Sequence, residues 1–119
     1  KMSEISLKIM KSIDHNKIIK IRKKNFLLFH KKLNSLNLLK INNNNKIVPM
    51  CYPLLLKKKI KKRLISKGIF IPTYWPEVLK RTQKDDFENF LTKNLICLPI
   101  DQRIDNSLIG KICNEVKKY

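Results

Sequence analysis

Residues 67–103 read KGIFIPTYWPEVLKRTQKDDFENFLTKNLICLPIDQR, and no other part of the chain says as much about its architecture. Aromatic, proline, glycine and acidic residues hold specific places here, whereas the rest of the chain is largely Lys, Asn, Ile and Leu. Gly68 stands where a preceding helix would end, because a residue without a Cβ adopts the left-handed conformation most easily. Residues 69–74 then favour a strand that Pro76 closes.

The second half of this stretch predicts a helix followed by a strand. Residues 78–82 favour a short helical turn, and Asp85 or Asp86 is expected to cap a helix that runs to residue 92 or 93. Residues 95–100 favour a short strand that Pro99 limits. The side chains expected to face inward from the helix are Phe87, Phe90 and Leu91.

Apolar spacings of three and four residues predict helices on both sides of this stretch. Residues 2–13 form the first, with Ser3 or Ser6 as cap, residues 14–36 the second and residues 57–67 the third, and Asp105 caps a last helix. Residues 42–45 favour a loop, and the proline-containing residues 47–56 favour an edge strand or one interrupted by bulges. The side chains expected to face inward are, in chain order, Ile5, Ile9, Ile13, Ile18, Ile21, Phe26, Phe29, Leu33, Leu36, Leu56, Ile60, Leu64, Leu108, Ile109, Ile112 and Val116.

The predicted order of elements is α-α-β-α-β-α-β-α. It favours an α/β or α+β architecture in which a sheet of about three strands packs on helices. A chain of 119 residues is long enough for one compact domain, so we expect a single domain over residues 1–119. Residues 1–41 would form a helical lead-in, and residues 46–119 the small α/β part.

The chain is strongly basic, with a net charge of +18 and a sequence pI near 10.1. No acidic residue lies between Asp14 and Glu77. Such a field favours polyanions, among them RNA, DNA, anionic lipid and nucleotide phosphates. The compositional interpretation is that Lys, Asn and Ile are what A/T-rich codons encode. It is favoured because the basic residues are not interleaved with aromatics as in a base-stacking surface.

Several kinds of site are disfavoured by the sequence. The three cysteines, Cys51, Cys97 and Cys113, include no C-x-x-C spacing, and both histidines lie far from them, so a zinc site is not expected. Two glycines are too few for the usual phosphate-cradling loops, and no H-E-x-x-H or G-x-S-x-G motif occurs. The acidic group at residues 85–88 is interpreted as helix capping. We therefore expect no metal site and no catalytic residue in this chain.

The cysteine count and the apolar content also bear on the compartment. An odd number of cysteines with apolar neighbours indicates free thiols in a reducing environment. We expect no secretory leader, and the sequence has no apolar run near 18 residues. We therefore expect a cytoplasmic protein without a membrane span.

Tyr74, Trp75 and Arg103 are the candidate binding residues. Tyr74 and Trp75 come at the end of an expected strand, where side chains emerge at a sheet edge and can contact a ligand. Arg103 follows the next expected strand and can hold a carboxylate or phosphate in two-pronged fashion. Two structural interpretations stand beside these: the aromatic pair simply covers the core, and Arg103 pairs with Asp101 or Asp105 to fix the turn.

Four segments together resemble one protein family. They are the pattern R-x-x-N-[FY] at Arg22, Asn25 and Phe26, the run VPMCYPLLL at residues 48–56, GIFIPTYW at residues 68–75 and LPIDQR at residues 98–103. In this order they resemble the C-terminal part of the DegT/DnrJ/EryC1/StrS aminotransferases. These are pyridoxal-phosphate enzymes that aminate keto sugars attached to nucleotides. The resemblance covers nearly the whole chain.

The resemblance implies a fold and a division of labour between domains. Such enzymes have a large cofactor domain and a smaller C-terminal α/β domain, and this chain matches the small domain with the helix that leads into it. The lysine that forms the Schiff base with pyridoxal phosphate lies in the large domain, and no segment like S-F-H-x-x-K occurs here. The resemblance therefore implies a chain that is inactive alone, without the large cofactor domain. It would work with that domain or a second subunit in amino-sugar and surface-polysaccharide biosynthesis.

The same resemblance bears on the aromatic pair. Many relatives carry His-Tyr where this chain has Tyr74 and Trp75, at the strand end that faces the substrate in the full enzyme. The resemblance thus implies that these two residues contact a nucleotide sugar. It transfers no catalytic role to any residue of this chain.

Two other functions stay open at this point. The acid-free region of residues 15–72 would suit a nucleic-acid-binding module, whose affinity would fall steeply with salt. The apolar faces of the first two helices would suit oligomerisation or the binding of a partner.

Overall fold

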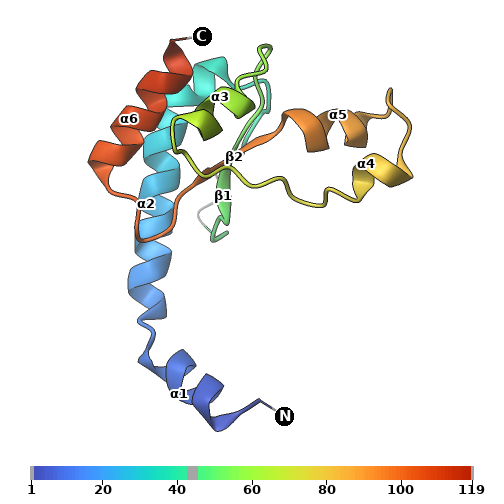
Figure 1. Cartoon of the computed structure of the whole chain (residues 1–119). Helices are drawn as coiled ribbons and strands as arrows, with labels where there is room; N and C mark the ends of the chain where they lie inside the picture. The colour runs from blue at the N-terminus through green and yellow to red at the C-terminus, as the bar shows by residue number, and fades with distance from the viewer. Residues whose placement is uncertain (1, 43–45, 119) are drawn as a thin grey trace.

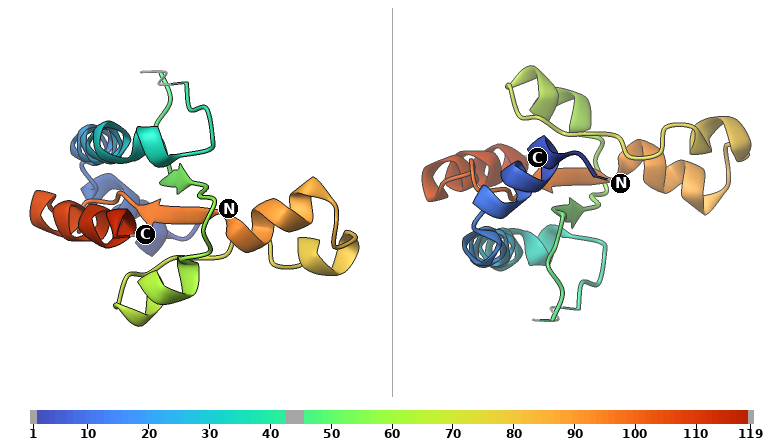
Figure 2. Two further views of the ribbon diagram at one scale, coloured as in Figure 1. Left: turned by 90° about the horizontal axis from the view of Figure 1, so that it is seen from above. Right: turned by 90° about the horizontal axis from the view of Figure 1, so that it is seen from below.

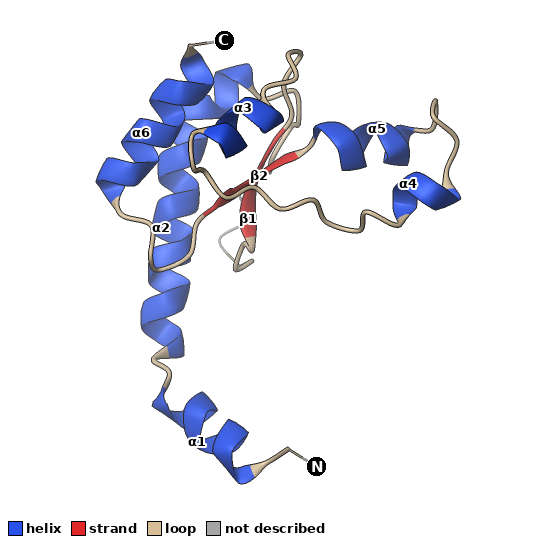
Figure 3. Ribbon diagram, in the orientation of Figure 1, coloured by secondary structure: helices blue, strands red, loops and turns tan. Residues whose placement is uncertain are grey.

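The computed structural model describes residues 2–42 and 46–118. In Figure 1 and Figure 3, α2 and α6 lie beside a pair of strands, while α1 and the α4–α5 arm reach away from this centre in different directions. The elements, in chain order, are α1 (Glu4–Ser12), α2 (His15–Leu33), the 3₁₀ turn η1 (Asn34–Leu36), β1 (Cys51–Leu54), α3 (Lys61–Ser66), α4 (Val78–Arg81), α5 (Phe87–Asn94), β2 (Ile96–Pro99) and α6 (Asn106–Lys117).

Side-chain caps begin three of the helices. Ser3, Asp14 and Asp105 each accept a hydrogen bond from the backbone N–H three residues further on, at 3.2, 2.9 and 2.7 Å. Such a bond satisfies an amide that has no partner inside the helix. The predicted caps Ser3 and Asp105 are confirmed. Asp14, expected as the first helical residue, is the cap of α2 instead.

The end of α3 follows the glycine prediction. Gly68 has a φ of 77°, and its N–H donates to the carbonyl oxygen of Ile65 at 2.9 Å. The next amide, that of Ile69, donates to Leu64 at 3.1 Å, which completes a Schellman motif. The helix begins only at Lys61, not at residue 57. Residues 57–59 are all exposed lysines that lie outside the helix.

The two strands form an antiparallel pair in which Tyr52 lies opposite Leu98 and Leu54 opposite Ile96. All four side chains are buried, and they join the apolar faces of α2 and α6 in one core. Figure 2 shows the strand pair between α2 with η1 on one side and α3 on the other. The helix residues buried in this core are Phe26, Phe29, Leu33, Leu64, Ile109, Ile112, Cys113 and Val116.

The expected three-stranded sheet is wrong, because the sheet has two strands and the architecture is mixed α+β. Residues 69–74 contain Pro72, which lacks an amide hydrogen for a ladder, and they run as a loop. The outer edge of β1 needs no third strand. The Asn37 side chain donates from Nδ2 to the Pro53 oxygen at 2.9 Å and accepts from the Leu55 N–H at 3.0 Å.

Several side chains expected inside are exposed. Phe87 is 64% exposed, and Phe90, Leu36 and Leu108 are also exposed. Phe87 and Phe90 are exposed because α5 packs against α4 rather than against the core. The buried side chain of this helix is Asn89. Ile5 and Ile9 of α1, which were expected to face inward, are exposed as well. The reason is that α1 lies apart from the core, as Figure 1 shows, and none of its residues is buried.

No helix in residues 2–42 and 46–118 has both the length and the apolar character to cross a bilayer. The longest, α2, has 19 residues and carries lysines along most of its length.

Candidate functional site

A hollow of about 610 Å³ lies where α2, residues 67–74 and the loop after β2 come together. Its wall includes Arg22 from α2, Tyr74, and the turn that contains Asp101 and Arg103. Two of the three candidate binding residues, Tyr74 and Arg103, therefore border one hollow although they are far apart in the sequence. The third, Trp75, does not line it.

Asn25 fixes the loop after β2 against α2. Its side chain is buried, and Nδ2 donates to the carbonyl oxygens of Ile100, Asp101 and Ile104 at 3.3, 3.2 and 3.0 Å. Buried carbonyls and amides that lose such partners are costly. The R-x-x-N-[FY] pattern and the LPIDQR segment, which the sequence separates, are thus in direct contact beside the hollow.

Asp101 and Arg103 form a two-pronged ion pair at the rim. Arg103 donates from Nε to Oδ1 at 2.8 Å and from Nη2 to Oδ2 at 3.0 Å, and its backbone N–H donates to Oδ1 at 3.0 Å. The hydrogen bond from the Arg103 side chain is the main reason why the pKa of Asp101 lies below its ordinary value. The expected pairing of Arg103 with Asp101 is confirmed, so the guanidinium fork is already occupied.

Tyr74 and Trp75 project from a loop rather than from a strand end. Tyr74 is half-buried, and its burial raises the pKa of its hydroxyl. Trp75 is 66% exposed with a φ of 50°, an uncommon conformation for a bulky residue. The two ring centroids are 5.7 Å apart, and both residues border a second hollow of about 250 Å³ next to α5. The aromatic pair is therefore accessible at the surface, although the strand that was expected to carry it is absent.

Arg22 is a site residue that the sequence marked only as part of a motif. Its Nη1 donates to the Pro49 oxygen at 3.4 Å, and its buried Nε has no hydrogen-bond partner among the described residues. Arg22 and Asn25 are three residues apart in α2, so they project from neighbouring positions on one side of the helix. The spacing in the R-x-x-N-[FY] pattern was the available signal for this arrangement.

Cys51 and Cys97 meet on the sheet beside the same hollow. Cys51 lies opposite Pro99 and Cys97 opposite Pro53, so the two are diagonal neighbours on one face. A hydrogen bond between the thiols lowers the pKa of Cys97 and raises that of Cys51. The predicted free thiols are confirmed, with Cys97 and Cys113 buried and Cys51 half-buried. Their separation in the sequence gave no sign that two of them meet.

The described residues do not fit a covalently held pyridoxal phosphate. No lysine among them is buried, since Lys23 and Lys61 are half-buried and the others exposed. Burial lowers the pKa of Lys61, but its Nζ is already engaged as a donor to the Thr73 hydroxyl at 2.7 Å. A metal centre is also unsupported, because no group of three acidic, histidine or cysteine side chains comes together in residues 2–42 and 46–118.

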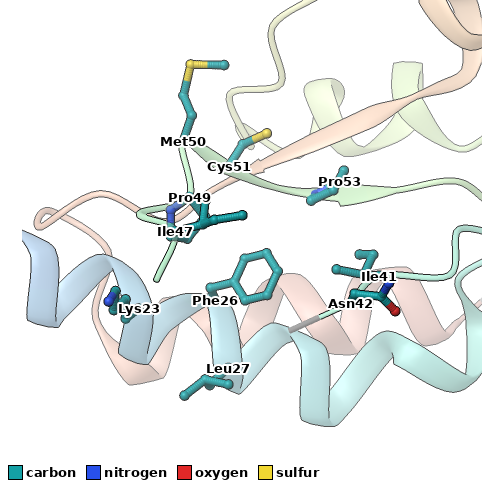
Figure 4. A pocket seen from close by; sticks show the side chains of 10 residues that line it. All are labelled: Lys23, Phe26, Leu27, Ile41, Asn42, Ile47, Pro49, Met50, Cys51 and Pro53. Carbon is teal, nitrogen blue, oxygen red and sulfur yellow. The ribbon is translucent and has the colours of Figure 1, made fainter. Parts of the chain in front are cut away.

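A separate pocket of about 260 Å³ lies between α2 and the chain that leads into β1. Figure 4 shows Phe26 of α2 facing Ile47 and Pro49 across it, with Lys23 at one end. Its wall is mostly apolar and brings together no reactive groups. It offers space for an apolar group and no chemistry.

Comparisons with family models, with curated proteins and with solved structures found no match to this chain. The candidate site therefore stands on its own geometry.

Proposed function

We propose that this chain is the small C-terminal domain of a pyridoxal-phosphate aminotransferase that acts on keto sugars attached to nucleotides. The observation that carries the proposal is the contact made by Asn25. It joins the R-x-x-N-[FY] pattern to the LPIDQR segment through hydrogen bonds to the Ile100 and Asp101 oxygens, with a third to Ile104 just after that segment. Motifs that come from one protein family are expected to lie together in the fold. The contact made by Asn25 supports the proposal because it brings two of these motifs together.

In this proposal the chain supplies one wall of a substrate site and no cofactor chemistry. Tyr74 and Trp75 are accessible on adjacent hollows, where aromatic faces can stack on a sugar or a base. The Schiff-base lysine comes from a large domain or a second subunit, in keeping with the lack of a buried lysine among the described residues. A cytoplasmic location belongs to the same proposal.

The experiment that tests the division of labour is cofactor trapping on this chain alone. The chain is mixed with pyridoxal phosphate, reduced with borohydride and digested for mass spectrometry. The proposal predicts scattered, sub-stoichiometric labelling of exposed lysines such as those at residues 57–59. Stoichiometric labelling of one lysine, abolished by its replacement with arginine, would mean that this chain holds the cofactor itself.

A further inference from the structure

We infer that the hollow bordered by Arg22 binds a phosphoryl group. The inference rests on the charges and partners of the hollow's own lining and does not depend on the aminotransferase proposal.

The guanidinium of Arg22 lacks a carboxylate partner among the described residues. No acidic residue lies between Asp14 and Glu77, so its own helix and the following segments offer none. Asp101 is near enough to interact electrostatically with Arg22, but both of its oxygens accept hydrogen bonds from Arg103. Arg22 therefore borders the hollow with no carboxylate hydrogen-bonded to it among the described residues.

Most hydrogen-bond donors of the Arg22 guanidinium are also without a partner among the described residues. A guanidinium has five N–H donors in a fixed fork. Only Nη1 has a partner among the described residues, the Pro49 oxygen at 3.4 Å, and the buried Nε has none. Because Nε has no exposed surface, the donors left for a phosphoryl oxygen in the hollow are those on the two Nη atoms that no described residue uses.

The rest of the lining favours a phosphoryl group over a single carboxylate. The hollow is bordered by three cations, Arg22, Lys67 and Arg103, and by one carboxylate, that of Asp101. Lys67 also lies in the field of Glu115, which forms an ion pair with Lys118. The excess of cations suits a group with more than one negative charge, and Tyr74 lines the same hollow. At about 610 Å³ the hollow has room for a pyrophosphate with part of an attached group.

Titration calorimetry with inorganic pyrophosphate at constant ionic strength tests this inference on the whole chain. We expect one saturable site in the wild type and a loss of affinity of about tenfold or more in Arg22→Gln, because two charge-assisted hydrogen bonds disappear. Arg81→Gln is the matched control. It removes the same charge from an exposed position in α4, away from the hollow, and should change the affinity less than twofold.

A second measurement keeps the inference testable if Arg22→Gln does not fold. In the wild type, pyrophosphate should shift the amide NMR signals of Arg22, Lys67 and Tyr74 saturably, and should leave those of residues 57–59 nearly unmoved. Equal losses in the two arginine variants, or shifts spread over all exposed lysines, would show an unspecific effect of net charge and overturn the inference. Binding of succinate as tight as that of pyrophosphate would overturn the assignment to a phosphoryl group. None of these outcomes decides the aminotransferase proposal, which the trapping experiment addresses.

Discussion

A single carboxamide, that of Asn25, holds the loop after β2 to the middle of α2. Three backbone oxygens of that loop accept from one Nδ2, and only the Asp101 oxygen has a further donor among the described residues, the Ile104 N–H at 3.1 Å. At the same loop, the carboxylate of Asp101 is held by Arg103. Asn25 and Arg103 thus hold the loop that forms one wall of the hollow.

Asn25→Ala should destabilise the fold by about 1–3 kcal/mol, because it leaves buried carbonyl oxygens without a donor. Urea unfolding followed by circular dichroism measures the difference. Asn114→Ala, at an exposed position of α6, is the control and should leave the stability unchanged or slightly higher. Equal stability of the wild type and Asn25→Ala would show that the loop holds its place by other contacts.

Arg103→Gln should change how stability depends on pH. The folded-state pKa of Asp101 is lowered, so the ion pair stabilises the fold above the unfolded-state pKa of about 3.9. This contribution disappears as the pH falls through the lower, folded-state value. The melting temperature of the variant should lie slightly below that of the wild type at neutral pH, and the two curves should converge in strong acid. The neutral-pH difference is small because solvent screens an exposed pair. A gap that persists or widens in acid would be incompatible with this assignment.

At the scale of elements, the residues that begin and end a helix act locally, so they can be recognised in the sequence. Ser3, Gly68 and Asp105 were predicted at their positions because each acts through backbone atoms a few residues away. The third strand was wrongly predicted because a partner strand is a non-local condition. Residues 69–74 begin with three apolar residues that favour a strand, but Asn37 already occupies the edge of β1.

The two glycines give a matched pair for testing these local signals. Gly68→Ala should cost about 1–2 kcal/mol, because φ at this position is 77° and an L residue is strained there. Gly110→Ala should instead stabilise by about 0.5–1 kcal/mol, because it lies inside α6 and a Cβ meets open space. Thermal unfolding of both variants measures these two changes in stability. The account of α3 fails if both substitutions have the same sign.

The candidate site shows the same limit of sequence reasoning. Tyr74 and Arg103 were named from strand ends, and they border one hollow although one of those strands is absent. Arg22 and the meeting of Cys51 with Cys97 were not anticipated as a site, because they depend on how distant segments pack. The R-x-x-N-[FY] spacing was the sole local hint, and it gains meaning only once Asn25 is seen to hold the loop.

At the scale of the whole molecule, α1 and the α4–α5 arm lie apart from the core, as Figure 1 shows. Large apolar side chains remain exposed on both, including Ile5 and Ile9 of α1 and Phe87 and Phe90 of α5. Exposed apolar surface of this kind is typical of a chain that packs against something else. It agrees with the proposal that a larger domain or second subunit completes the protein.

The chain alone should therefore self-associate through α1. Sedimentation velocity should show more than one copy at high concentration, and Ile5→Gln combined with Ile9→Gln should move the distribution toward the monomer. The control is Lys8→Gln combined with Lys11→Gln in the same helix, and this variant should leave the distribution unchanged. A wild type that stays monomeric across the concentration range would show that these exposed residues are not an association surface.

The coding sequence immediately upstream of this chain gives the most direct test of the proposed function. The account predicts that sequencing finds a large cofactor domain with its Schiff-base lysine, in the same reading frame and leading into residue 1. A stop codon and a ribosome-binding site directly before the chain, with no such domain encoded beside it, would contradict the account.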